Sequence, residues 1–165
     1  MFELKLMSRE AIPEALAKVE RYRLLNEPVE AASICQDVLR IDPDNQQALV
    51  MLLLALTDQF DDGHFMKEAR ALIPRLRSEY ERAYYSGIVS ERLAKALQKK
   101  DVPGSRHIIY EFFREAMRGY ERAEAIRPTG NDDAILRWNT CARILMSNPR
   151  LEPGTEERAE AVLSE

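Results

Sequence analysis

The chain has 165 residues, of which 45% are hydrophobic and 32% are charged, a balance typical of a soluble helical protein with one buried core. Its 24 basic and 28 acidic residues give a net charge of −4. This charge argues against a general nucleic-acid binder, which needs a basic surface. It does not exclude a local basic patch. With no secretory hydrophobic region and no apolar stretch near the ~20 residues that span a bilayer, we expect a cytoplasmic protein without a membrane partner.

Residues 9–43 predict a hairpin of two amphipathic helices. Apolar residues recur every three or four positions across residues 12–22 and again across 29–39, which is the spacing of one buried helix face. Pro28 suits the first turn of the second helix, where its missing N–H is not needed. Pro43 ends that helix, because its ring disfavours helical backbone in the preceding residue.

Residues 44–78 predict a second hairpin. Asp44 begins a capping-box pattern that would open its first helix. Residues 48–56 are apolar on every side, so we expect this helix to be covered from several directions. Pro74 interrupts the second helix, and we expect it to kink or end the helix there.

Residues 79–128 predict a third hairpin. Ala83 and Gly87 lie four positions apart, a spacing that lets a neighbouring helix approach closely. The turn near residues 101–104 is followed by Ser105, which we expect to cap the second helix of this pair.

The remainder predicts an unpaired helix over residues 131–147 and a capping helix over 155–164, so that a single domain spans residues 1–165. Cys35 and Cys141 both fall within apolar helical stripes. We interpret them as small buried hydrophobic residues and not as reactive thiols.

The sequence offers no catalytic, cofactor-binding or metal-binding motif, and His64 and His107 are interpreted as surface residues. Arg114, Arg118 and Arg122 share one helix face. They form either a positive surface for an acidic peptide or phosphate, or, as the favoured interpretation, a solvated face interleaved with glutamates.

The first hairpin resembles the tetratricopeptide repeat (TPR), a 34-residue helical hairpin that ends in Asp-Pro-x-Asn. Seven residues carry the resemblance: Tyr22, Glu30, Ala31, Leu39, Asp42, Pro43 and Asn45. The chain departs from the pattern at Val19, where the family usually has glycine, and at Cys35, where it has an aromatic residue. The resemblance implies an all-α, right-handed superhelix of three to four hairpins with a C-terminal cap.

That family binds extended peptides in a concave groove lined by the first helix of each hairpin. The resemblance therefore implies a peptide site that includes Arg23, Leu54, Tyr84, Ile88, Arg92, Asn139 and Arg143. The same register also places six further residues on this groove: Glu20, Leu24, Val50, Asp58, Glu91 and Ile135.

Three functional hypotheses follow. The first is a non-catalytic adaptor that binds a peptide or protein segment in the groove, with no cofactor. The second is a structural protein that assembles with copies of itself, as a homodimer or larger oligomer. The third and least favoured is a small-molecule binder or enzyme with residues 52–56 as a pocket wall.

Overall fold

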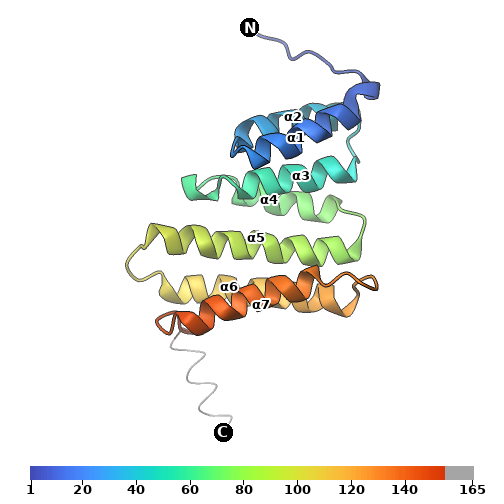
Figure 1. Ribbon diagram of the computed structural model, residues 1–165. Helices are drawn as coiled ribbons and strands as arrows, with labels where there is room; N and C mark the ends of the chain where they lie inside the picture. The colour runs from blue at the N-terminus through green and yellow to red at the C-terminus, as the bar shows by residue number, and fades with distance from the viewer. Residues whose placement is uncertain (155–165) are drawn as a thin grey trace. The chain divides into compact units, whose positions relative to one another are not determined.

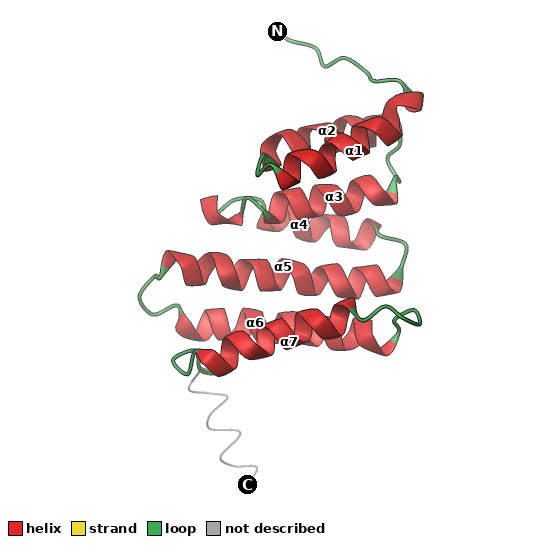
Figure 2. Ribbon diagram, in the orientation of Figure 1, coloured by secondary structure: helices red, strands yellow, loops and turns green. Residues whose placement is uncertain are grey.

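A computed structural model describes residues 1–154, and the predicted cap at 155–164 lies outside them. Within these residues the chain forms seven α-helices and three short 3-10 turns, with no strand (Figure 1; Figure 2). The all-α prediction is therefore confirmed. No helix in the described part is long and apolar enough to cross a membrane.

The contacts divide the chain into two compact units, Met1–Ser78 and Glu79–Glu165. Each unit is described by itself below. The placement of all hairpins in one continuous domain stays a prediction.

The first unit contains four helices, each packed on the next, and the first also contacts the third. Their bounds are α1 Ile12–Leu24, α2 Pro28–Ile41, α3 Gln46–Thr57 and α4 Met66–Leu72. Pro28 stands in the first turn of α2, as its missing N–H requires. After α4 the chain makes a 3-10 turn, Ile73–Arg75, so Pro74 ends this helix and does not kink it.

The cap of α3 is Asn45 and not Asp44. The Asn45 side chain accepts a hydrogen bond from the Ala48 N–H at 2.9 Å, and its N–H₂ group donates to Asp42 at 3.1 Å. The predicted capping box is therefore wrong by one residue. An asparagine amide satisfies the free N–H as well as a carboxylate does.

The core of the first unit lies against α3, whose apolar residues are buried on several sides as predicted. One cluster joins Ile12, Leu16, Val38 and Ala48, and Met7 packs against it. By contrast, three apolar residues of the preceding N-terminal segment are exposed: Phe2, Leu4 and Leu6.

The second unit contains α5 Glu79–Lys100, α6 Arg106–Ala125 and α7 Asp133–Ser147. Helices α5 and α6 run very close together where two glycines meet. A Cβ added at Gly119 would lie 2.9 Å from the Gly87 nitrogen and 3.1 Å from the Ala83 carbonyl oxygen. The close approach predicted from Ala83 and Gly87 is confirmed.

Two smaller predictions in this unit have opposite outcomes. Ser105 occupies the cap position of α6 but does not cap it, because its hydroxyl donates to the Val102 carbonyl oxygen at 2.6 Å.

Cys141 is fully buried, as is Cys35 in the first unit, and both thiols are free. The interpretation of the cysteines as buried small residues is confirmed.

Candidate functional site

The second unit has a buried carboxylate at its centre, that of Glu91 on α5. Tyr120 on α6 donates its hydroxyl hydrogen to Glu91 Oε2 at 2.5 Å, and Arg137 on α7 donates from Nη1 to Oε1 at 3.2 Å. Lys95, one turn along α5, also pairs with Oε1. We call these four residues the Glu91 network. Because the Glu91 side chain is only 1% exposed, this network holds the three helices around one charge.

A row of tyrosine rings adjoins the network at Tyr120. The rings of Tyr80 and Tyr84 are stacked with centroids 5.8 Å apart, and Tyr84 also lies 5.8 Å from the Tyr120 ring. Burial raises the pKa of Tyr84, an effect that its hydrogen bond with Arg137 opposes. Burial also raises the pKa of Tyr120, and the Glu91 carboxylate raises it further. These phenols therefore stay neutral and serve as donors and packing groups.

The first unit has a related ion pair between α1 and Asp58, the residue that follows α3. Arg23 donates from Nε to the Asp58 carboxylate at 2.8 Å, with a second contact of 3.3 Å from Nη2. In both units, therefore, an arginine on one helix pairs with a carboxylate two helices away along the chain. The resemblance to the tetratricopeptide repeat predicts that Arg23, Asp58 and Glu91 lie on the groove side of these alternate helices.

The predicted site residues have different environments. Arg23 is ion-paired, and Leu54, Tyr84 and Arg92 are partly buried. Ile88 is only 2% exposed, so its side chain belongs to the core and is not available at a surface.

On α7, the residue that reaches Glu91 on α5 is Arg137, which is not among the predicted site residues. Arg143 is exposed. Asn139 instead faces α6, where it lines a pocket.

This pocket, the Trp138 pocket, has a volume of about 340 Å³. It lies between α6 and α7 and is lined by five residues: Glu121, Glu124, Ile135, Trp138 and Asn139. The Trp138 indole N–H donates to Glu121 Oε1 at 2.9 Å. This bond fixes the indole and the carboxylate relative to each other at one wall.

The Trp138 pocket carries negative charge. Within the described residues neither Glu121 nor Glu124 forms an ion pair, and the Glu124 side chain has no hydrogen-bond partner. The adjacent Arg127 pairs with Asp132 at 3.2 Å. Two carboxylates beside an indole and an isoleucine form a site with an anionic part and an apolar part.

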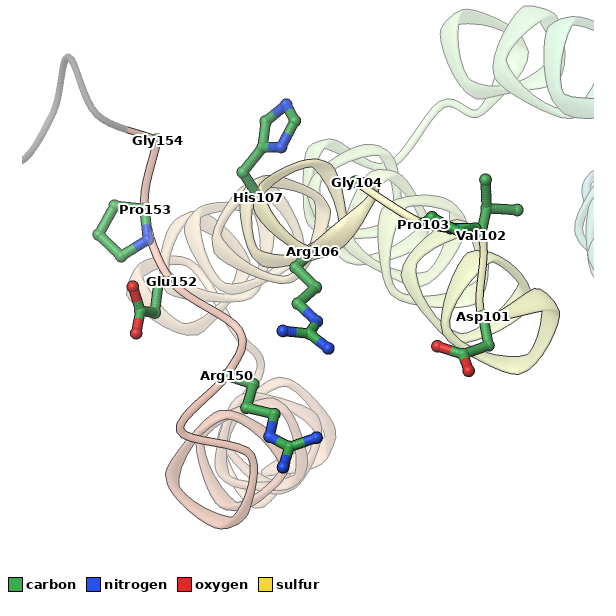
Figure 3. Close-up of a pocket in the computed structure, with 10 residues that line it drawn as sticks. All are labelled: Asp101, Val102, Pro103, Gly104, Arg106, His107, Arg150, Glu152, Pro153 and Gly154. Carbon is green, nitrogen blue, oxygen red and sulfur yellow. The ribbon is translucent and has the colours of Figure 1, made fainter.

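A larger hollow of about 810 Å³ lies where the turn before α6 meets the chain after α7 (Figure 3). Arg106 and Arg150 extend into the same space, and Asp101 and Glu152 stand at its sides. Its walls are mostly turns, and its charges are of both signs. This chemistry does not select one class of ligand, so the smaller Trp138 pocket is the better defined site.

The candidate histidines and arginines lie at or near the surface. His64 and His107 are exposed, and the described residues contain no group of three or more metal-ligating side chains. Arg118 and Arg122 are also exposed, while Arg114 lies partly buried with Nη1 3.8 Å from the Met117 sulfur.

No protein-family model matches the chain, and the searches of curated proteins and of solved structures found no significant match.

Sequence reasoning missed Arg137 and the two acidic walls of the Trp138 pocket. Trp138 falls within the apolar stripe of the helix predicted over residues 131–147, a pattern that predicts packing and not a pocket. The sequence does hold one indication of a pocket at this position. Trp138 is followed directly by the polar residue Asn139, and the opposite side of the same helix also carries apolar residues. Glu121 and Glu124 gave no signal, because glutamates of an amphipathic helix are ordinarily solvated.

Proposed function

We propose that the chain is a non-catalytic, cytoplasmic binding module with a TPR-like arrangement of hairpins, and that it holds an extended segment of another protein. The observation that carries the proposal is the Trp138 pocket. It offers an apolar wall, two unpaired carboxylates and a carboxamide within one concave site. Binding sites for peptide side chains combine these features.

The ion pairs support the proposal by fixing the helices that present such a surface. Arg137 bonds to Glu91 and Tyr84 on one side of α7, while Trp138 and Asn139 lie at the pocket. A helix held by a buried charge has little freedom to reorient. A pre-organised pocket binds more tightly, because less conformational entropy is lost when the ligand binds.

The test is selection of peptide ligands from a phage-displayed random library on the purified chain. Selected peptides are synthesised, and their Kd values are measured by fluorescence polarisation. Asn139→Arg places a long side chain in the pocket, and we expect the Kd to rise at least about tenfold, equivalent to about 1.4 kcal/mol.

The matched control is Leu136→Arg, which adds the same side chain one turn away at a position that is 61% exposed and outside the pocket. This variant should bind like the native chain. The proposal fails if no peptide is enriched over an unrelated helical protein, or if both variants bind as the native chain does.

The second candidate function is self-assembly, which the N-terminal segment favours. Phe2, Leu4 and Leu6 alternate with polar residues and are each at least 70% exposed, although Met7 anchors the segment to the core. Solution mass measured by light scattering distinguishes the candidates. Self-assembly predicts a dimer or larger species that dissociates when these three residues are replaced by serine.

A further inference from the structure

The Trp138 pocket has a charge and shape that define the kind of side chain it takes. We infer that it binds one cationic side chain of the partner segment, arginine in preference to lysine. This inference rests on the proposed function, since it names the ligand class of the same pocket.

The charge balance of the pocket is the first argument. Glu121 and Glu124 lie one turn apart on α6, and neither has a cationic partner within the described residues. The guanidinium of Arg127 is directed elsewhere, to Asp132 and to the Glu124 backbone oxygen at 3.1 Å. Glu121 is exposed and Glu124 is partly buried, so the two like charges repel each other at the mouth of the pocket, and a bound cation relieves that repulsion.

The fixed donor and acceptor groups are the second argument. The indole N–H of Trp138 occupies one lone pair of Glu121 Oε1, which leaves the other carboxylate oxygen free to accept. The Asn139 carboxamide supplies a further acceptor on the α7 side. A guanidinium has five N–H donors in one plane and can bond to several such acceptors at once.

The apolar wall is the third argument. Ile135 and the Trp138 ring lie in the same lining as the carboxylates. A bare metal ion gains nothing from such a wall, whereas arginine and lysine carry methylene stems that pack on it. The indole also attracts a guanidinium more favourably than a compact ammonium ion, which explains the preference for arginine.

The experiment uses the fluorescence of Trp138, which is the only tryptophan in the chain. The probes are N-acetyl-arginine amide and its uncharged isostere, N-acetyl-citrulline amide. We expect the arginine probe to change the emission in a saturable manner, with a Kd on the order of 1 mM for so small a ligand. The citrulline probe should bind at least about tenfold more weakly, and salt should weaken the arginine response.

The pocket variant is Glu121→Gln with Glu124→Gln, which removes both charges but keeps an acceptor for the indole N–H. Its arginine response should be lost while its far-ultraviolet circular dichroism is unchanged. The matched control is Glu10→Gln with Glu14→Gln, which changes the net charge equally at two exposed positions of the first unit. This control should respond like the native chain.

The outcomes separate this inference from the proposed function. Equal responses to arginine and citrulline, or an unchanged response in the pocket variant, overturn the inference. If the Asn139→Arg variant nevertheless binds the selected peptides more weakly than the native chain, the peptide-binding function holds, but the pocket takes a different class of side chain. If instead the arginine probe binds as expected but no peptide is selected, the pocket prefers a guanidinium but does not bind a peptide segment, and the peptide-binding function fails.

Discussion

The guanidinium of Arg137 on α7 lies 3.2 Å from the carboxylate of Glu91 on α5, and these two residues are separated by 46 positions in the sequence. The acceptor is almost fully buried, while the arginine side chain is 32% exposed. A charge removed from water is tolerated only when its partners replace the lost hydration. Glu91 obtains this replacement from Arg137, Tyr120 and Lys95 together, so one side chain links all three helices of the second unit.

Glu91→Ala is expected to destabilise the protein by about 3 kcal/mol, because it leaves the buried Tyr120 hydroxyl and two cations without their partner. Glu91→Gln keeps an acceptor for Tyr120 and should cost less, about 1–2 kcal/mol. Urea unfolding followed by circular dichroism measures both values.

The control for this prediction is Arg23→Gln in the first unit. Both partners of that ion pair are more exposed than Glu91, with side-chain exposures of 24% and 19%. Its loss should cost about 1 kcal/mol or less. A smaller effect for Glu91→Ala than for Arg23→Gln would show that the Glu91 network does not hold the second unit together.

Alkaline pH is expected to destabilise the second unit. Burial raises the pKa of Tyr85 from 10 to about 12, and the Glu81 carboxylate adds to this effect. Between these two values the unfolded chain has lost the phenolic proton while the folded chain keeps it. The folded state then binds more protons, so the free energy of unfolding falls as pH rises through this window.

The measurement is the urea midpoint at successive pH values above 10, with tyrosinate absorbance recorded in parallel. Tyr85→Phe removes one titrating group that lies outside the Glu91 network, so its midpoint should fall less steeply. A native midpoint that stays constant across the window would contradict the raised pKa of the tyrosines.

The sequence predicts elements whose cause is local. The apolar spacing of residues 12–22 and 29–39 predicts two helices that the structure contains, because each helix buries one continuous stripe. The close approach at Gly87 was also predictable, since a helical glycine lacks the side chain that would separate the backbones. The position of the α3 cap at Asn45 was not predictable, because the adjacent Asp44 and Asn45 are both residue types that cap helices well.

The candidate site depends on contacts between distant residues, and for that reason the sequence predicted it only in part. A charged residue such as Glu91 is expected at the surface. Its burial is explained only by Tyr120 and Arg137, which bond to its carboxylate from two other helices. The Trp138 pocket depends on how α7 lies on α6. Helical periodicity shows which residues share a face, but it does not determine which face of the next helix they meet.

Gly119→Ala is expected to destabilise the second unit although alanine favours helices by about 1 kcal/mol relative to glycine. The added methyl group would lie 3.0 Å from the Gly87 Cα and close to backbone atoms that cannot rotate away. Overpacking of this kind costs about 1–3 kcal/mol, so the clash should exceed the gain in helix propensity. The Tm values of the native chain and of Gly119→Ala, measured by thermal unfolding, show which of the two effects is larger. An increase in Tm would show that α5 and α6 separate at little cost.

The two cysteines should resist thiol reagents in the folded protein. Burial raises the pKa of Cys35 to about 12, although Arg23 opposes the effect. Burial also raises the pKa of Cys141 to about 12, with the Glu91 carboxylate adding to it. Because the thiolate is the reactive form and both side chains are inaccessible, we expect dithiobis(nitrobenzoic acid) to modify neither thiol without denaturant.

Cys35→Ala and Cys141→Ala each leave one thiol, in the second and the first unit respectively. The urea concentration at which the remaining thiol reacts therefore reports the opening of its own unit. We expect reaction to accelerate only across the unfolding transition seen by circular dichroism, because each thiol lies within a helix that must separate from its neighbours first. Rapid, complete modification in the absence of urea would contradict this placement of the thiol.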